Sequence, residues 1–362
     1  MKILVVDDSA FMRRSLTKLI ESDPDLRVVD TARDGLDAVE KAKRLKPDLI
    51  TLDVEMPKMN GLEALRQIMA ECPTTVLMVS SLTTKGSREA LKALRLGAAD
   101  FVAKDASFVS LNVESIREEL VAKIKALGPS SKAASVRAAG APGSKKTSGE
   151  TPTFEADRFG LIVIGSSTGG PPVVETIAAA LAPDLAGPVV LAQHMPAVFT
   201  KSLAERLNVK CAVSVYEAED GMPLYPGTMY VAPGGRQTRI RKSIAGGWSL
   251  RVNDDPADAL YKPSVTTLFE SAVKVAEGRT LGVVLTGMGD DGAAGAERIV
   301  AGGGVVLTQS AETCVVYGMP KAVNEAGHSK ASLSPGKLCD ALRQLRITEQ
   351  GAASAASARK AG

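Results

Sequence analysis

Short runs of apolar, β-branched residues alternate along the chain with longer stretches in which apolar positions recur every three or four residues. In the first 125 residues, the apolar runs fall at 2–8, 27–32, 49–54, 75–81 and 99–105. The stretches with helical spacing between them are 10–22, 34–46 and 60–71. A regular alternation of strand and helix predicts a parallel sheet with helices on both faces.

The same alternation returns from residue 159 onward. Here the apolar runs are 161–165, 188–194, 229–235, 281–287 and 303–309. They are almost continuously apolar, which is typical of strands buried on both faces of a parallel sheet. The pattern therefore predicts an α/β protein with two doubly wound parallel-sheet domains.

Two segments have neither periodicity and consist of small and polar residues. Such segments bury too little surface to offset the entropy lost on ordering. We therefore expect a first domain over 1–125, a flexible linker over 126–158, a second domain over 159–348 and a disordered tail over 349–362.

Composition excludes several classes of protein. Lys and Arg number 44 and Asp and Glu 41, a net charge of +3, and aromatic residues make up 4% of the 362 residues. This balance argues against a nucleic-acid partner recognised by charge. No apolar run approaches the ~18 residues of a membrane span. Asp7 and Asp8 interrupt the first apolar run, unlike a signal peptide, and the four cysteines form no C-x-x-C pair. We expect a cytoplasmic protein without direct membrane insertion.

Polar side chains follow the first-domain strands at the point where each strand ends. Asp7 and Asp8 follow the first strand, Asp53 the third, Ser80 lies at the end of the fourth and Lys104 at the end of the fifth. The carboxyl ends of parallel strands meet at one edge, where ligands bind. Carboxylates gathered there suit Mg²⁺, and a lysine and a hydroxyl suit a phosphoryl group on a central carboxylate. Each Asp taken alone is equally consistent with capping a helix.

The segments VVDDSA, TLDVEMPKMNG, MVSS and DFVAK resemble the receiver domain of bacterial response regulators over residues 1–123. The resemblance implies a flavodoxin-like fold in which Asp53 is the phosphoacceptor. It also implies Mg²⁺ bound by Asp8, Asp53 and the backbone carbonyl of Glu55, with Asp7 in the same pocket.

The same resemblance implies roles for three more residues. Ser80 would be the switch hydroxyl, Phe101 the switch aromatic and Lys104 the phosphate-binding lysine. Receivers usually have a proline in a cis peptide after this lysine, whereas Asp105 follows it here. A cis peptide before a non-proline residue costs about 2.5–4 kcal/mol, so the geometry of this peptide is open.

A second set of polar residues follows the strands of the second domain. Ser167 lies in Gly165–Gly169, a G-x-S-x-G turn between a strand and a helix, and His194 and Asp291 each follow another strand. A serine nucleophile needs a base, and the base needs a carboxylate to hold its tautomer. Taken alone, the turn could bind phosphate and the histidine could be structural. The order Ser, His, Asp differs from that of α/β-hydrolases, so we expect a different fold.

The segments GSSTGG, QHMP, YVAPGG, KPSV, LTGMGDDGAAG and CVVYGMPKAV are similar to the methylesterase domain of chemotaxis response-regulator protein-glutamate methylesterases. The resemblance implies that Ser167 is the nucleophile, His194 the general base and Asp291 its orienting acid. Asp290 stands where the family commonly has Asn, so two acids compete for this role, and position in the motif favours Asp291. Cys314 lies within a matching segment and has no evident role.

What the resemblance implies is hydrolysis of glutamate γ-methyl esters, and deamidation of glutamines, on methyl-accepting chemoreceptors. Backbone N–H groups near Thr168 and Met288 are the candidate oxyanion donors. The chemotaxis histidine kinase would supply the phosphoryl group that activates the enzyme. Mg²⁺ in the receiver would be the one cofactor, with none in the esterase domain. The alternative is a same-fold esterase or adaptor that serves a non-chemotaxis receptor pathway.

Overall fold

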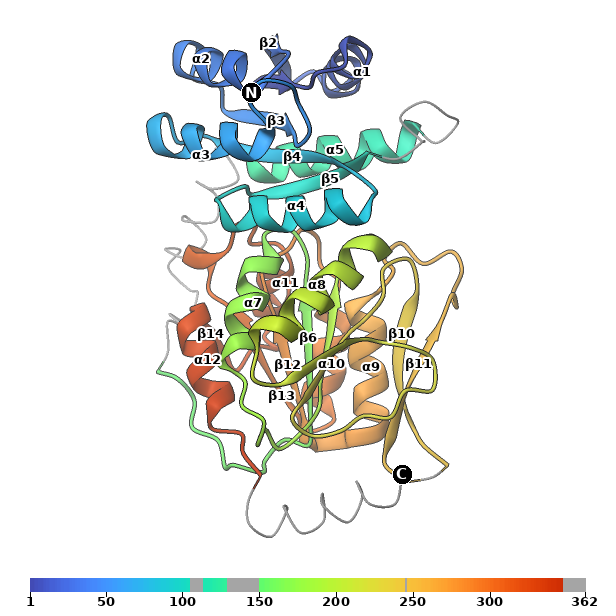
Figure 1. Ribbon diagram of the computed structural model, residues 1–362. Helices are drawn as coiled ribbons and strands as arrows, with labels where there is room; N and C mark the ends of the chain where they lie inside the picture. Colours follow the sequence, from blue (N-terminus) through green and yellow to red (C-terminus); the bar gives the residue numbers. More distant parts are fainter. Residues whose placement is uncertain (105–112, 129–149, 245, 348–362) are drawn as a thin grey trace. The chain divides into compact units, whose positions relative to one another are not determined.

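The computed structural model describes residues 1–104, 113–128, 150–244 and 246–347 (Figure 1). The chain divides into two compact units, Met1–Ala134 and Ser135–Gly362. Asp105, most of the expected linker and the expected tail lie outside the described residues. No helix among the described residues is long and apolar enough to cross a membrane.

The first unit is a parallel sheet of five strands in the order β2-β1-β3-β4-β5. The strands are β1 (Lys2–Val6), β2 (Arg27–Ala32), β3 (Leu49–Asp53), β4 (Thr75–Ser81) and β5 (Asp100–Lys104). The helices are α1 (Ala10–Ile20), α2 (Gly35–Leu45), α3 (Gly61–Glu71), α4 (Thr84–Arg95) and α5 (Val113–Leu127). Helix α1 packs against α5, and α3 packs against α2 and α4, as expected for right-handed crossovers that cover both faces.

Local sequence explains where these helices begin. The side chains of Ser9, Asp34 and Asn60 accept hydrogen bonds from backbone N–H groups in the first turns of α1, α2 and α3. Asn60 also forms a capping box with Glu63. Such caps satisfy N–H groups that have no partner within the helix. The predicted strands and helices of this unit are confirmed, with boundaries within a few residues.

The second unit has a parallel sheet of seven strands in the order β14-β13-β12-β6-β7-β9-β8. These strands are β6 (Leu161–Ser166), β7 (Val189–Gln193), β8 (Ser214–Glu217), β9 (Thr228–Val231), β12 (Thr280–Val284), β13 (Val305–Gln309) and β14 (Ala331–Leu333). Strands β6, β7, β9 and β12 are buried throughout, in keeping with their apolar runs. The predicted fold class, two parallel α/β units, is confirmed.

A two-stranded antiparallel hairpin, β10 (Gln237–Lys242) and β11 (Trp248–Asn253), forms a sheet of its own in the second unit. The helices of this unit are α7 (Gly170–Ala180), α8 (Ala197–Lys210), α9 (Val265–Ala276), α10 (Ala293–Ala301), α11 (Met319–Glu325) and α12 (Pro335–Arg343). Helix α7 packs against α8 and α12, and α10 packs against α9 and α11. Helix α9 also packs on β10, so the hairpin and this helix form one body beside the sheet.

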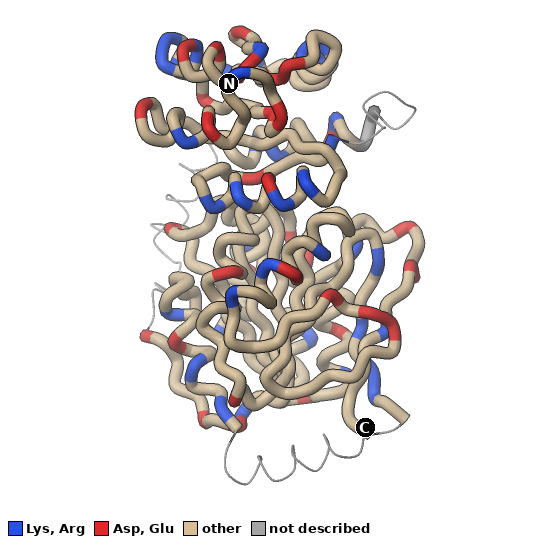
Figure 2. The backbone as a smooth tube through the Cα atoms, in the orientation of Figure 1, with Lys and Arg blue, Asp and Glu red and all other residues tan. Residues whose placement is uncertain are grey.

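Both sheets reverse their strand order at one position. In the first unit the reversal lies between the neighbouring strands β1 and β3, because β2 is added on one side of this pair and β4 and β5 on the other. In the second unit it lies between β6 and β12. Crevices at the carboxyl ends of such strand pairs are where open α/β sheets bind ligands. Figure 2 shows that basic and acidic residues are interspersed along both units.

Part of the segment expected to be a linker contacts the second unit. The backbone N–H of Phe154 donates to Gln344 Oε1 at 2.8 Å, and Gln344 Nε2 donates to the carbonyl of Pro152 at 3.1 Å. The Phe154 ring lies edge-on to Phe159, with ring centroids 5.1 Å apart. Arg158 donates to two backbone carbonyls of the same unit at 2.6 and 3.0 Å. The hydrogen bonds of Gln344 and of Arg158 join residues more than 100 positions apart, so local composition does not reveal them.

Candidate functional sites

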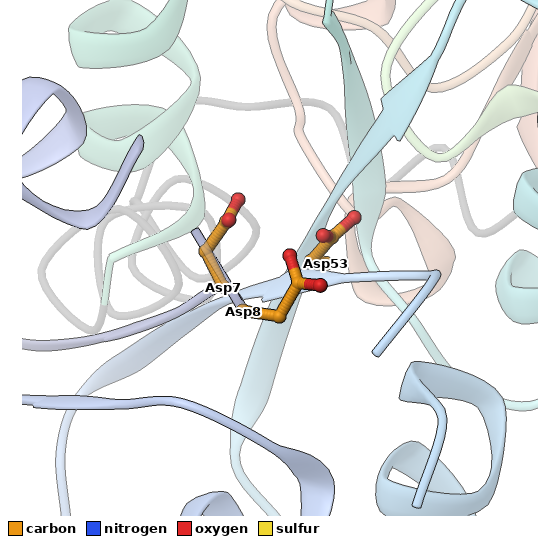
Figure 3. A group of neighbouring side chains, drawn as sticks. All are labelled: Asp7, Asp8 and Asp53. Atoms are coloured by element: carbon orange, nitrogen blue, oxygen red, sulfur yellow. The ribbon is translucent and has the colours of Figure 1, made fainter. Parts of the chain in front are cut away.

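Three carboxylates meet at the switch point of the first sheet. Asp7 and Asp8 follow β1, Asp53 ends β3, and one carboxylate oxygen from each lies within 4.8 Å of the others (Figure 3). Asp7 and Asp53 are buried, whereas Asp8 is exposed. This is an all-oxygen set open to solvent on one side, which suits a hard, partly hydrated cation such as Mg²⁺.

Lys104, at the end of β5, reaches across to the same pocket. Its Nζ lies 2.6 Å from Oδ2 of Asp7 and 2.7 Å from Oδ2 of Asp53. Burial alone would lower the pKa of Lys104, but the two carboxylates raise it above its usual value. Burial raises the pKa of Asp53 to about 6, and Lys104 offsets part of that rise. At neutral pH, Asp53 is therefore less completely ionised than an ordinary aspartate, although the Lys104 ammonium group lies beside it. A cation bound in the pocket would favour the ionised form of Asp53.

The other residues of the predicted receiver set lie around this pocket but do not all point into it. The Ser80 hydroxyl is buried and donates to the carbonyl of Gly86 in α4 at 3.1 Å. The Glu55 side chain forms an exposed ion pair with Lys85 at 2.7 Å. Phe101 is 3% exposed.

Phe101 also contacts Lys123 of α5. The Nζ of Lys123 lies 5.5 Å from the Phe101 ring centroid, donates to the Phe101 carbonyl at 2.7 Å and is 3.0 Å from Asp100. Burial would lower the pKa of Lys123, but Asp100 and Glu119 raise it. The cation therefore stays charged and ties α5 to the first residues of β5.

Ser167 lies directly beyond the last residue of β6, at the switch point of the second sheet. Its backbone N–H donates to the Thr286 carbonyl at 3.0 Å, and its carbonyl accepts from Gln193 Nε2 at 2.9 Å. The turn is therefore fixed to the strands on both sides of β6. The preceding residue, Ser166, is fully buried, whereas Ser167 is partly exposed, so the second serine is the one that reaches the crevice. The positive φ of the turn falls on Gly169, at +75°, rather than on Ser167.

His194 follows β7, the strand next to β6. Its backbone N–H donates to the Ser166 carbonyl at 3.0 Å, which places it beside the serine turn. Its ring Nε2 lies 2.8 Å from Oδ2 of Asp291, with the two side chains 12% and 4% exposed. Because Nε2 contacts the carboxylate, Nδ1 is the ring nitrogen left to accept a proton.

Asp291 lies between β12 and α10, and its carboxylate caps the N-terminus of α9. Its Oδ2 accepts from the Val265 N–H at 2.7 Å, and its Oδ1 accepts from the Thr266 N–H at 2.9 Å and the Ser264 hydroxyl at 3.1 Å. Burial would raise the pKa of Asp291, but the contacts with His194 and with the two backbone N–H groups lower it to about 2. The carboxylate is therefore ionised and oriented before any substrate binds. The adjacent Asp290 is exposed.

The backbone N–H groups of Thr168 and Met288 have no hydrogen-bond acceptor among the described residues. Thr168 follows Ser167 directly. Gly287 precedes Met288, and a methyl group added to Gly287 would lie 2.7 Å from Cβ of Ser167. Both N–H groups thus belong to segments that flank the serine.

Three residues of this site were not among the sequence predictions. Tyr261 stacks on the His194 ring, and Ser264 caps α9 while its hydroxyl donates to Asp291. The Gln237 side chain forms hydrogen bonds with the Tyr261 carbonyl and the Ser264 N–H. A Ser before an apolar helical run is an N-cap signal, so Ser264 was predictable as a cap. Nothing in local sequence pairs Tyr261 with a histidine 67 positions earlier.

Comparisons with known proteins cover nearly the whole chain. The CheB methylesterase family model matches residues 162–342, and the response regulator receiver domain model matches residues 3–114. A relative from Oleidesulfovibrio alaskensis, named protein-glutamate methylesterase/protein-glutamine glutaminase 1, is 46% identical over an alignment of 352 residues. The alignment covers 90% of this chain and 94% of the relative.

A relative from Thermotoga maritima, named protein-glutamate methylesterase/protein-glutamine glutaminase, is 42% identical over 344 residues, covering 95% of this chain and 98% of its own. The crystal structure of the Thermotoga maritima CheB methylesterase catalytic domain is 38% identical, with a TM-score of 0.50. It covers 51% of this chain and 98% of that domain.

Proposed function

Because the chain belongs to the CheB methylesterase family and has a response-regulator receiver domain before its catalytic domain, we propose that Ser167, His194 and Asp291 carry out its protein-glutamate methylesterase and protein-glutamine glutaminase reactions. The observation that carries this assignment is the ionised Asp291 in contact with His194, beside the turn that presents Ser167. The substrates are glutamyl methyl esters and glutamines of chemoreceptors.

In the first half-reaction, the Ser167 oxygen bonds to the ester carbonyl carbon while His194 Nδ1 takes the serine proton. Asp291 keeps the other ring proton on Nε2 and stabilises the imidazolium that forms. The tetrahedral intermediate then collapses, and the methoxy group leaves as methanol with the proton from His194. In the second half-reaction, His194 activates water, which releases the glutamate carboxylate and restores Ser167.

The backbone N–H groups of Thr168 and Met288 would receive the negative charge on the carbonyl oxygen. A donor that is fixed before the reaction and points at this charge lowers the activation free energy by on the order of 3 kcal/mol. The glutaminase reaction is the same sequence with ammonia as the leaving group, so it needs no additional residue.

In the receiver, we propose that Asp53 accepts a phosphoryl group and that this raises esterase activity. Mg²⁺ would be held by Asp8, Asp53 and the Glu55 carbonyl, and it would neutralise charge on the phosphoryl oxygens. Lys104, now paired with Asp53, would then hold a phosphoryl oxygen. The phosphoryl group would come from the chemotaxis histidine kinase.

The test of the catalytic assignment is methanol release from membranes that carry methylated receptors. Ser167→Ala should abolish release, whereas Ser166→Ala, the neighbouring serine whose buried hydroxyl has no partner among the described residues, should keep most of it. Equal loss in both variants, or activity that survives Ser167→Ala, contradicts the assignment.

A further inference from the structure

The face of the His194 ring is covered by a second aromatic ring. The Tyr261 and His194 rings are almost parallel, with an interplanar angle of 6° and centroids 4.5 Å apart. The Asp291 contact fixes one edge of the imidazole, but it leaves the ring free to rotate about the axis of that hydrogen bond. A parallel ring on its face removes that freedom.

The position of Tyr261 is itself fixed by a buried side chain. Gln237 of β10 is fully buried, and its amide donates to the Tyr261 carbonyl at 2.7 Å while its carbonyl accepts from the Ser264 N–H at 2.9 Å. The segment from Tyr261 to Thr266 therefore holds both partners of the pair. Tyr261 contacts the imidazole face, and the residues after it bind the carboxylate of Asp291.

We propose that Tyr261 is a positioning residue for the esterase reaction: its ring holds the His194 imidazole in the plane that points Nε2 at Asp291, and its π face stabilises the imidazolium formed when Ser167 loses its proton. This role rests on the proposed function of the triad. An aromatic face attracts a cation placed over it, and a parallel ring also adds contact energy to the neutral imidazole.

The ring, rather than the hydroxyl, performs this role. The Tyr261 hydroxyl has no hydrogen-bond partner among the described residues, and it lies next to Gly289, where an added methyl group would come within 2.9 Å of it. Burial and the charges of Asp291 and Asp290 raise the pKa of Tyr261, so the phenol stays neutral. Phenylalanine at position 261 should therefore preserve the activity, and an aliphatic residue should not.

The experiment measures kcat and KM of the full chain for methanol release from methylated receptor membranes. Tyr261→Leu should lower kcat about 3- to 30-fold with KM within about twofold, because the lost contact acts on the imidazolium and not on substrate binding. Tyr261→Phe should stay within about twofold of wild type. Tyr216→Leu makes the same chemical change on edge strand β8 and should leave both constants unchanged.

A second measurement detects the Tyr261–His194 stack by NMR in wild type and in Tyr261→Phe, so it tests the proposal even if Tyr261→Leu unfolds the catalytic unit. The chain has two histidines, His194 and His328, so the His194 ring protons are assigned by comparison with His328→Gln. Their ring-current shift should be present in wild type and in Tyr261→Phe. Absence of that shift in wild type, wild-type kcat in folded Tyr261→Leu, or a Tyr261→Phe defect as large as that of Leu overturns the proposal. If wild type itself releases no methanol, the proposed function fails first.

Discussion

Replacing Asp291 with asparagine tests two effects of its carboxylate, which caps the N-terminus of α9: its contribution to folding stability and its control of the His194 ring proton. Each carboxylate oxygen accepts two hydrogen bonds, Oδ1 from Ser264 and Thr266 and Oδ2 from Val265 and His194. An amide nitrogen at either position therefore faces two donors. At the Oδ2 position it would also donate to His194 Nε2 and move the ring proton to Nδ1, which could then no longer accept a proton.

The structure gives a magnitude for the effect on stability. The pKa of Asp291 is lowered from 3.8 to about 2. A shift of this size corresponds to about 2 kcal/mol, because each tenfold change in an acid dissociation constant is worth about 1.4 kcal/mol. Because the folded value lies below the unfolded one, this stabilisation is complete above about pH 4 and is lost as the pH falls through about 2. Asp291→Asn should thus lower the free energy of unfolding by about 2–3 kcal/mol at pH 7, and by less near pH 3.

The assay uses the single tryptophan. Trp248 lies on β11, so its fluorescence in urea reports unfolding of the catalytic unit and not of the receiver. Methanol release should fall about 10³- to 10⁴-fold, as expected when the carboxylate of a Ser-His-Asp triad becomes an amide. The matched control is Asp290→Asn, the exposed neighbour, which should change neither quantity. An Asp291→Asn enzyme with more than about a tenth of wild-type activity, or an equal defect in Asp290→Asn, refutes the reasoning.

Three further predictions concern other parts of the two units. In the metal-free protein, the Asp53 carboxyl carbon should titrate in NMR near pH 6, because burial raises its pKa to about 6, and saturating Mg²⁺ should move the midpoint to lower pH; a midpoint near pH 4 that Mg²⁺ does not move contradicts this. Gly170→Ala should destabilise the catalytic unit by about 1–3 kcal/mol in urea, because the added methyl group would lie 2.0 Å from the hydroxyl oxygen of Ser166. The control Gly336→Ala, on a helix with open space around it, should not destabilise it. Cys314 is half-buried, and desolvation raises the pKa of its thiol to about 12, so the thiol should resist iodoacetamide at pH 8 until the protein is denatured. Rapid labelling of the native protein, read by mass spectrometry, would contradict this raised pKa.

The sequence was most informative where local pattern and chemistry coincide. Strands such as β6 and β12 are fully buried and read as continuous apolar runs, so their positions and parallel pairing could be predicted. The residues that end these strands follow directly, which is why a meeting of Asp7, Asp8 and Asp53, and of His194 with an acid, could be predicted without coordinates.

Other features depend on contacts that no local pattern records. Strand β10 has a single apolar residue, Ile240, between Arg239 and Arg241, and no strand was predicted there. Two adjacent acids follow β12, and only the path of α9 determines that Asp291 is buried against His194 while Asp290 is exposed. Tyr261 reaches the imidazole because Gln237 holds its backbone from another strand.

The central claim is that one chain couples an aspartyl phosphate in the receiver to a serine esterase in the catalytic unit. The most direct test is methanol release from methylated receptor membranes by wild type, Asp53→Ala and Ser167→Ala, each with and without a small-molecule phosphodonor and Mg²⁺. We predict that the phosphodonor stimulates methanol release by wild type and leaves Asp53→Ala at its basal rate. Ser167→Ala should release no methanol with or without the phosphodonor. Stimulation that persists without Asp53, or release that persists without Ser167, would contradict this account.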